Sequence, residues 1–213
     1  MKPHFPMMVN LDGRPCLVVG GGGVAERKIA SLLESGAVIT VISPEVTATI
    51  ENWGVTNRLT WKKEMFSDQE VSGYTLIIAA TNLRRVNHAV YEKAKEHQLW
   101  VNIVDRPDLC NYIVPSIVRR GKLVMAVSTS GASPGLASKI RKKLENDFGV
   151  EYESYVDFLA EMRMNVMKEI TQASVRKYIF KELLDERFIY APPEEREQMA
   201  IELIKLAKDT KQV

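Results

Sequence analysis

The sequence has little of what a secreted, metal-binding or membrane-spanning protein requires. Its 213 residues include only two cysteines, Cys16 and Cys110, which are too few for a disulfide framework. The three histidines, His4, His88 and His97, are scattered and form no metal-ligand spacing with the cysteines. No apolar run approaches the ~18 residues that a membrane helix needs, and the first residues lack the apolar core of a signal peptide. We therefore expect a cytoplasmic protein without a resident metal and without a membrane partner.

Other familiar signals are also missing. The chain has no Gly-x-Ser-x-Gly elbow, which argues against an α/β-hydrolase. It has neither internal repeats nor low-complexity tracts. Its apolar fraction of 46% and charged fraction of 26% are those of an ordinary globular protein, and its length predicts one or two domains.

The strongest positive signal is a glycine-rich turn near the N-terminus. An apolar strand ends at Val19, four glycines follow, and a helical pattern begins directly behind them. The spacing Gly20-x-Gly22-x-x-Ala25 fits a dinucleotide-binding fingerprint. Gly20 permits a tight turn, Gly22 allows the backbone to approach a pyrophosphate, and Ala25 lets the helix pack close to the sheet. We predict that residues Gly20, Gly21, Gly22, Gly23, Val24 and Ala25 bind a dinucleotide, the alternative being a simple strand-to-helix turn.

Strands and helices alternate over the first half of the chain. Residues 15–42 have the pattern of strand, helix and strand, with Gly36 as the residue that ends the helix. A strand at 74–80, a helix over 83–97 and a strand at 100–104 follow. This alternation predicts an α/β fold with a doubly wound parallel sheet, which makes residues 1–113 a Rossmann-like nucleotide-binding domain.

The pattern changes after residue 113. Residues 115–127 predict two strands about a short turn at Arg120-Gly121, and Ser133 and Pro134 are typical first residues of a helix that runs to about Phe148. From Glu151 onward there is no strand signal, and three helices are predicted at 152–170, 173–188 and 193–209. We therefore predict a small α+β segment over 114–149 and a helical domain over 150–213.

Basic residues gather in the middle segment. Residues 114–143 hold seven lysines and arginines and no acidic residue, whereas the rest of the chain has 22 basic and 27 acidic residues. Such a block favours an anionic partner. The segment has neither zinc-ligand spacing nor an RNA-binding aromatic motif, so a nucleic-acid partner is not predicted. A solvated helix face remains the alternative.

Two polar loops follow predicted strands and should face the same crevice. Ser43, Pro44 and Glu45 follow the second strand, where an acidic residue binds the ribose of NAD. Ser43, directly after the strand, is not acidic, and Glu45 lies two residues beyond that position. The turn also has no arginine that could bind the 2′-phosphate of NADP, so NAD is the preferred cofactor. Thr81 and Asn82 follow the next predicted strand, where Asn82 either contacts the cofactor or caps the following helix.

A third loop carries a candidate general base. Asp105 comes at the end of the strand at 100–104, where a carboxylate in a partly desolvated cleft can accept a proton. Arg106 beside it is a candidate for binding a substrate carboxylate. On pattern alone, Asp-x-Pro is more often a turn than a catalytic site, so the residues by themselves leave the role of Asp105 open.

These motifs together resemble a known family. The runs Val-Val-Gly-Gly-Gly-Gly-Val-Ala-Glu-Arg-Lys (18–28), Thr-Val-Ile-Ser-Pro-Glu (40–45), Ala-Ala-Thr-Asn (79–82), Val-Asn-Ile-Val-Asp (101–105) and Val-Ser-Thr-Ser-Gly-Ala-Ser-Pro (127–134) are similar to those of the precorrin-2 dehydrogenases of sirohaem synthesis. The resemblance covers about residues 5–148, and the C-terminal helices match only in kind.

The resemblance implies an NAD-dependent oxidation of precorrin-2 to sirohydrochlorin. It places the family's catalytic aspartate at Asp105 and implies a homodimer that exchanges the segment at about 114–149. The substrate is a macrocycle with eight carboxylates, which the basic segment would bind. Candidate substrate-binding residues are Arg106, Arg119, Arg120, Ser128 and Ser130, the two serines lying beside a helix N-terminus.

Two alternatives accompany this interpretation. Some members of the family also insert iron, so the chain is either a dehydrogenase alone or a bifunctional dehydrogenase and ferrochelatase in which Asp105 serves both reactions. Some are fused to a methyltransferase, for which 213 residues leave no room, so a stand-alone form is expected. An NAD-sensing module without catalytic activity is the alternative from another functional class.

Overall fold

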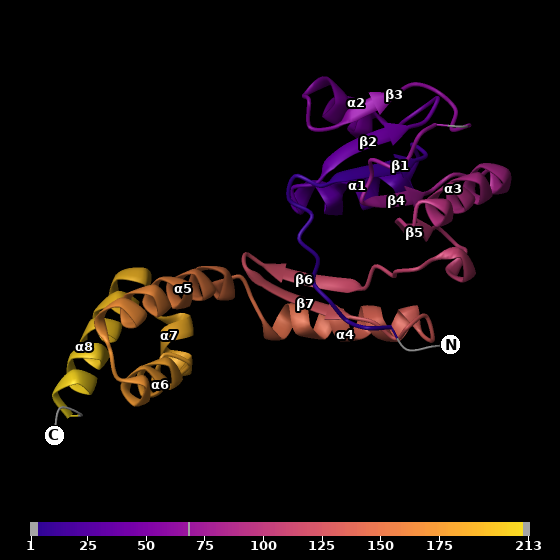
Figure 1. Cartoon of the computed structure of the whole chain (residues 1–213). Helices are drawn as coiled ribbons and strands as arrows, with labels where there is room; N and C mark the ends of the chain where they lie inside the picture. Colours follow the sequence, from indigo (N-terminus) through magenta and orange to yellow (C-terminus); the bar gives the residue numbers. More distant parts are fainter. Residues whose placement is uncertain (1–3, 68, 211–213) are drawn as a thin grey trace. The chain divides into compact units, whose positions relative to one another are not determined.

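The computed structural model describes residues 4–67 and 69–210. The chain divides into two compact units, Met1–Val114 and Pro115–Val213 (Figure 1). The first is an α/β unit, and the second joins a small hairpin to helices. The further division of the second unit at residues 149 and 150 stays a prediction.

The first unit contains a five-stranded parallel sheet. Its elements are β1 (Pro15–Val19), α1 (Gly23–Glu34), β2 (Val38–Ile42), α2 (Ala48–Val55), β3 (Thr60–Lys62), β4 (Leu76–Ala79), α3 (Arg84–Glu96), β5 (Trp100–Ile103) and the 3-10 turn η1 (Pro107–Leu109). The strand order is β3-β2-β1-β4-β5, and every neighbouring pair is parallel. The chain therefore reverses its direction across the sheet between β1 and β4, which is where open α/β sheets bind ligands.

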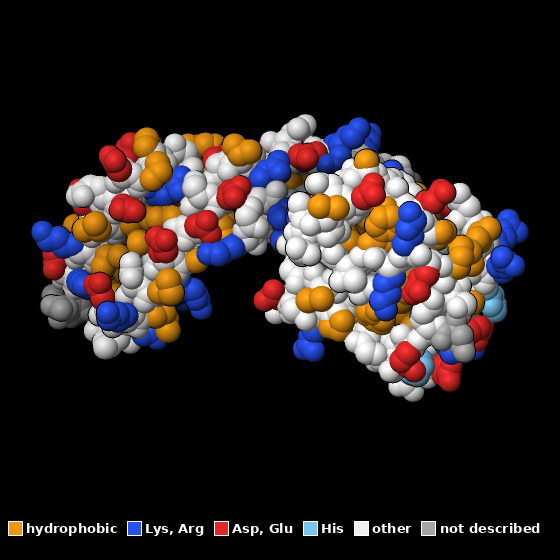
Figure 2. Space-filling model, turned by 90° about the horizontal axis from the view of Figure 1, so that it is seen from above, with side chains coloured by type: hydrophobic (Ala, Val, Ile, Leu, Met, Phe, Trp, Pro, Cys, Tyr) orange, Lys and Arg blue, Asp and Glu red, His pale blue; other side chains and the backbone are white. Residues whose placement is uncertain are grey.

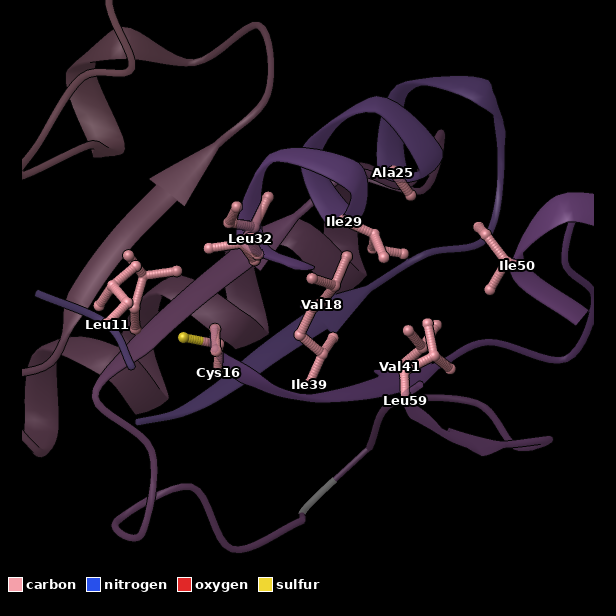
Figure 3. Close-up of a cluster of buried hydrophobic side chains, with 13 residues drawn as sticks. Leu11, Cys16, Val18, Ala25, Ile29, Leu32, Ile39, Val41, Ile50 and Leu59 are labelled. Carbon is pink, nitrogen blue, oxygen red and sulfur yellow. The ribbon is translucent and has the colours of Figure 1, made fainter. Parts of the chain in front are cut away.

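Apolar side chains cover both faces of this sheet, which confirms the doubly wound α/β fold. On one face, Val18 and Val41 pack beneath Ala25 and Ile29 of α1 and Ile50 of α2 (Figure 3). The opposite face buries a second cluster, formed by residues Leu17, Val19, Ile77, Val101, Ile103, Val86, Val90 and Ala94, in which the last three belong to α3. Successive residues of β1 alternate between the two clusters, because neighbouring side chains in a strand point to opposite faces.

The predicted stop of α1 at Gly36 is confirmed. Gly36 has a φ of +74°, which is a left-handed conformation that glycine adopts without steric cost. Its N–H donates to Leu33 O at 3.2 Å, and the N–H of Ala37 donates to Leu32 O at 3.2 Å. This pair of bonds is a Schellman motif, in which the last carbonyls of a helix gain partners.

The structure adds two elements that the sequence pattern did not predict, α2 and β3. Helix α2 has eight residues, includes Gly54, and buries only Ile50. Strand β3 has three residues and lies at the edge of the sheet. Both are too short for a clear hydrophobic period. Strand β3 pairs with β2, and Ile50 of α2 lies in the same buried cluster as Ile29 of α1.

The second unit begins with an antiparallel hairpin and a helix. Strands β6 (Ser116–Arg120) and β7 (Leu123–Val127) confirm the predicted pair, although the turn lies at Gly121-Lys122, one residue later than predicted. Helix α4 (Pro134–Asp147) begins as predicted, because the Ser133 Oγ accepts a hydrogen bond from Leu136 N at 3.2 Å.

Up to residue 210, where the described part of the chain ends, four helices rather than the predicted three complete this unit. They are α5 (Glu151–Glu169), α6 (Ala173–Glu182), α7 (Glu186–Tyr190) and α8 (Pro193–Thr210). The predicted helix at 173–188 is wrong because Asp185 caps a new helix, its carboxylate accepting from Arg187 N at 3.0 Å. Val166 and Ile170, from the predicted helix at 152–170, are buried among the helices of this unit. Hydrophobic side chains also lie among the charged ones on the visible surface of these helices (Figure 2).

Two negative findings concern the described residues. Within 4–67 and 69–210, no helix is both long and apolar enough to cross a membrane. In the same part of the chain, no three His, Cys, Asp or Glu side chains form a group that could hold a metal ion.

Candidate functional site

The glycine-rich turn leaves the carboxyl end of β1 in a conformation that only glycine fits. Gly20 has a φ of +117°, and a Cβ there would contact the Ala80 carbonyl, with its carbon at 2.8 Å. A Cβ on Gly21 would contact the Glu45 carbonyl and lie 2.8 Å from Val46 Cα. Gly22 and Gly23 differ from these two, since a Cβ at either would meet no atom within 4 Å. Gly20 and Gly21 therefore allow neighbouring backbone segments to approach closely, whereas Gly22 and Gly23 face open space.

The N-terminus of α1 points its free N–H groups into that space. Gly22 is the N-cap residue, and the structure shows no side-chain cap at this end of α1. The N–H groups of the first turn have no partner within the helix. Together with the partial positive charge of the helix N-terminus, they form a binding site for an anion such as a pyrophosphate.

A cavity of about 520 Å³ joins three of the predicted loops. Loops from the ends of β1, β2 and β4 meet there, because parallel strands present their carboxyl ends at one edge of the sheet. The predicted residues that line it are Gly20, Gly21, Gly22, Gly23, Val24, Ser43, Pro44, Glu45, Thr81 and Asn82. Ala25 does not line the cavity: it is fully buried against the sheet, so its role is close packing of α1. Met65 and Phe66 also line the cavity, and sequence reasoning missed them because no motif marks their segment.

Ser43 and Glu45 have different roles within their turn. Ser43 is buried, and its hydroxyl donates to Glu45 O at 2.6 Å. The carbonyl of Ser43 accepts from Trp61 Nε1 at 2.9 Å, which ties the turn to β3. Glu45 is exposed at the cavity, so its carboxylate is the acidic group available to a ribose hydroxyl.

The loop after β4 is held by a buried asparagine. The Thr81 hydroxyl donates to Asn87 Oδ1 at 2.8 Å, and Asn87 Nδ2 donates back to Thr81 O at 2.9 Å. The capping alternative for Asn82 is wrong, because Leu83 is the N-cap residue of α3 and its N–H donates to Thr81 Oγ1 at 3.1 Å. Asn82 is exposed at the cavity instead. Sequence analysis did not predict this role of Asn87, because the residue lies within a helical pattern and belongs to no motif.

Asp105 is not among the residues that line this cavity. It is the third residue of a turn from Ile103 to Arg106, which is closed by a 3.2 Å bond from Arg106 N to Ile103 O. Its φ of +62° is uncommon for a residue other than glycine. The turn follows β5 at the same edge of the sheet, next to β4. The side chain is exposed, whereas the sequence led us to expect a partly desolvated carboxylate.

Arg106 already has a carboxylate partner within the chain. Its Nε and Nη2 donate to the two oxygens of Asp108 at 3.0 and 2.7 Å. These hydrogen bonds hold the pKa of Asp108 below its usual value and keep it ionised. Arg106 is therefore engaged with Asp108 in this conformation and would have to exchange that partner to bind a substrate.

The candidate residues of the second unit differ in whether their side chains already bond within the chain. Arg120 caps the end of α4, donating from Nε to Phe148 O and from Nη2 to Glu145 O, each at 3.0 Å. Arg119, in contrast, is exposed on the hairpin. Ser128 and Ser130 lie in the loop before α4, where Ser128 Oγ accepts from Ser130 N at 3.0 Å. Ser130 has a φ of +52°, a left-handed conformation that is uncommon for a residue other than glycine.

Comparisons with known proteins match both units. Residues 7–116 match the family described as "Putative NAD(P)-binding", and residues 120–147 match the family "Sirohaem biosynthesis protein central". A siroheme synthase of Nitrosococcus oceani is 36% identical over 203 residues, covering 93% of this chain and 43% of the relative. One of Pseudoalteromonas translucida is 42% identical over 142 residues, covering 67% of this chain and 30% of the relative. The chain thus spans less than half the length of these curated relatives.

A solved structure matches almost the whole length. The structure named "SirC, precorrin-2 dehydrogenase" superposes with a TM-score of 0.81 at 32% identity, covering 95% of this chain and 99% of that one. The match therefore includes the C-terminal helices, which the sequence motifs had matched only in kind. The chain belongs to the precorrin-2 dehydrogenase family of sirohaem biosynthesis.

Proposed function

We propose that this chain oxidises precorrin-2 to sirohydrochlorin and passes a hydride to NAD. The cavity at the end of β1 carries this proposal, because it joins an uncapped helix N-terminus to an exposed acidic residue. The likeness to a precorrin-2 dehydrogenase over 95% of the chain supports the choice of substrate. Two hydrogens leave the macrocycle, one as a hydride to NAD and one as a proton to the protein.

The residues around the cavity fit a dinucleotide. Gly22 and Gly23 leave open space in front of the first turn of α1, where the pyrophosphate would accept N–H donors. Glu45 would bind the ribose hydroxyls, which favours NAD over NADP because a 2′-phosphate would be repelled by this carboxylate. When bound, NAD supplies the hydride acceptor, and the protein supplies position and electrostatics.

Asp105 is the proposed general base. It would accept the proton from the macrocycle as the hydride leaves. Its exposure makes it accessible to a large substrate. Its left-handed backbone also supports the proposal, because a conformation that is costly for a residue with a side chain is often retained where function needs it.

The basic segment is the proposed binding surface for the carboxylates of the macrocycle. Arg119 has an exposed guanidinium that can contact a carboxylate with two hydrogen bonds. Ser128 and Ser130 lie just before the N-terminus of α4, which attracts anions. Arg106 and Arg120 are weaker candidates, because their donors already bond within the chain.

We further propose a homodimer in which the β6–β7 hairpin lies at the interface. Ile117 pairs with Ala126 on the hairpin and is 39% exposed, although it lies in a strand. An unpartnered apolar face on a two-stranded sheet is typical of an interface. The expected mass in sedimentation is that of two chains. Ile117→Asp should give single chains, whereas Val55→Asp, at a position that is 76% exposed, should leave the mass unchanged; a single-chain mass for the unmodified protein would contradict the proposal.

The activity is tested by an anaerobic assay with precorrin-2 and NAD. We expect the absorbance spectrum of sirohydrochlorin to appear together with that of NADH, since each turnover transfers one hydride. A repeat with ferrous or cobaltous ion tells the dehydrogenase from a bifunctional enzyme, for which the metal-dependent change would exceed the protein-free rate. NAD binding without any turnover would contradict the proposal and favour a sensing module.

A further inference from the structure

The turn that carries Asp105 has an unusual support. Strand β5 is the edge strand of the sheet, so the N–H and C=O groups on its outer side have no neighbouring strand. Ile103, the last residue of β5, is 1% exposed, and its backbone groups need partners within the protein. Those partners come from the segment 110–112, which returns alongside β5 after η1.

Side chains provide much of this pairing. Asn111 Oδ1 accepts from Val101 N at 2.8 Å, and Asn111 Nδ2 donates to Leu99 O at 2.8 Å. Asn102 Nδ2 donates to Tyr112 O at 3.2 Å. These contacts attach the returning segment to the beginning and the middle of β5. They leave the end of the strand, where the Asp105 turn begins, to Cys110.

Cys110 bonds to backbone groups on both sides of Asp105. Its sulfur accepts from Ile103 N at 3.2 Å, and its S–H can donate to Arg106 O at 3.3 Å or to Ile103 O at 3.4 Å. Burial raises the pKa of the thiol, so the group keeps its proton and remains a donor. Ile103 and Arg106 are the first and last residues of the turn in which Asp105 has its φ of +62°. The Cys110 side chain therefore bonds to both ends of the turn.

We propose that Cys110 is a positioning residue for Asp105, holding the Ile103–Arg106 turn so that the carboxylate meets the substrate at the orientation that proton transfer needs. The proposal rests on the proposed role of Asp105 as the base. A left-handed aspartate has alternative backbone conformations of lower energy, and a turn released at either end can relax into them. Misplacement of a reacting group by about 1 Å can slow a reaction up to ~100-fold.

The test compares two substitutions that differ by one hydroxyl group. Cys110→Ala removes all hydrogen bonds of the sulfur, and Cys110→Ser restores a donor and an acceptor at nearly the same place. We expect Cys110→Ala to lower kcat for precorrin-2 oxidation by about tenfold, with the KM values for both substrates changed less than about twofold. Cys110→Ser should recover most of the lost kcat. Equal kcat values for Ala and Ser, or a wild-type kcat for Ala, would overturn the proposal.

Asn111→Ala is the matched control for a general loosening of the segment. It removes two hydrogen bonds from the same returning segment but leaves both contacts of the turn with Cys110. We expect a lower free energy of unfolding and a nearly unchanged kcat. A kcat as low as that of Cys110→Ala would mean that any loosening suffices, which contradicts a specific role for the sulfur. Should Cys110→Ala not fold, Cys110→Val and Cys110→Thr repeat the comparison with side chains of matched shape.

The experiments distinguish failure of the proposed function from failure of the positioning role of Cys110. A wild-type protein without turnover, or an active Asp105→Asn variant, removes the proposed function or its base whatever Cys110 does. An active wild type and an inactive Asp105→Asn, together with a fully active Cys110→Ala, remove only the positioning role.

Discussion

Asp105→Asn is expected to lower kcat for precorrin-2 oxidation by about 1000-fold, because an amide cannot accept the proton that leaves with the hydride. Asparagine is the informative replacement, since it tolerates a left-handed backbone about as well as aspartate and better than most residues. Alanine at a φ of +62° would add a backbone cost of about 1–2 kcal/mol. A loss of activity in that variant could then come either from the missing base or from a rearranged turn. The measurement is single-turnover absorbance at saturating NAD and precorrin-2.

The control for this variant is Asp108→Asn. Asp108 is an exposed aspartate three residues further on, so the chemical change is the same. We expect its kcat to stay within about threefold of wild type, because the general base is intact. The Kd for NAD should be unchanged in both variants, as neither residue lines the cavity beside the glycine turn. A fully active, folded Asp105→Asn protein would show that another group accepts the proton.

Gly22→Ala should fold like the wild type and bind NAD on the order of 100-fold more weakly. Its φ of −81° is accessible to alanine, and the new methyl group would meet no protein atom within 4 Å. The methyl group would instead occupy the space that the pyrophosphate needs. Losing one or two hydrogen bonds to a charged group costs about 1.5–3 kcal/mol each, and every 1.4 kcal/mol is tenfold in affinity. Isothermal titration with NAD measures the Kd, and thermal unfolding checks the fold.

Two other glycines provide contrasts for this variant. Gly21→Ala places its Cβ against Glu45 and Val46, so it should lower the free energy of unfolding by several kcal/mol and lose NAD binding indirectly. Gly135→Ala, in the second unit, also has open space around it and should change neither stability nor NAD affinity much. Unchanged NAD affinity in Gly22→Ala would mean that the ligand does not approach this part of the loop.

Local patterns predicted the glycine turn, the stop of α1 and the start of α4 correctly because each depends on residues close in sequence. The stop at Gly36 needs a residue that can adopt a positive φ, and the start at Ser133 needs a hydroxyl three residues before Leu136. The strands at 15–19 and 38–42 were predictable because a parallel strand covered on both faces is largely apolar, as both of these runs are. Short elements such as α2 lacked such a signal, since they depend on packing against residues far along the chain.

The sequence by itself determined the doubly wound fold, the glycine turn, and the assignment of the loops after β1, β2 and β4 to one edge of the sheet, because periodicity and turn chemistry are written in neighbouring residues. Only the tertiary structure decided how these groups are used. It engaged Arg120 with carbonyls 25 and 28 residues away, turned Ser43 inward, and placed Cys110 across the Asp105 turn. These pairings depend on which backbone donors and acceptors, distant in the sequence, lack a partner. Only the folded chain decides which groups those are.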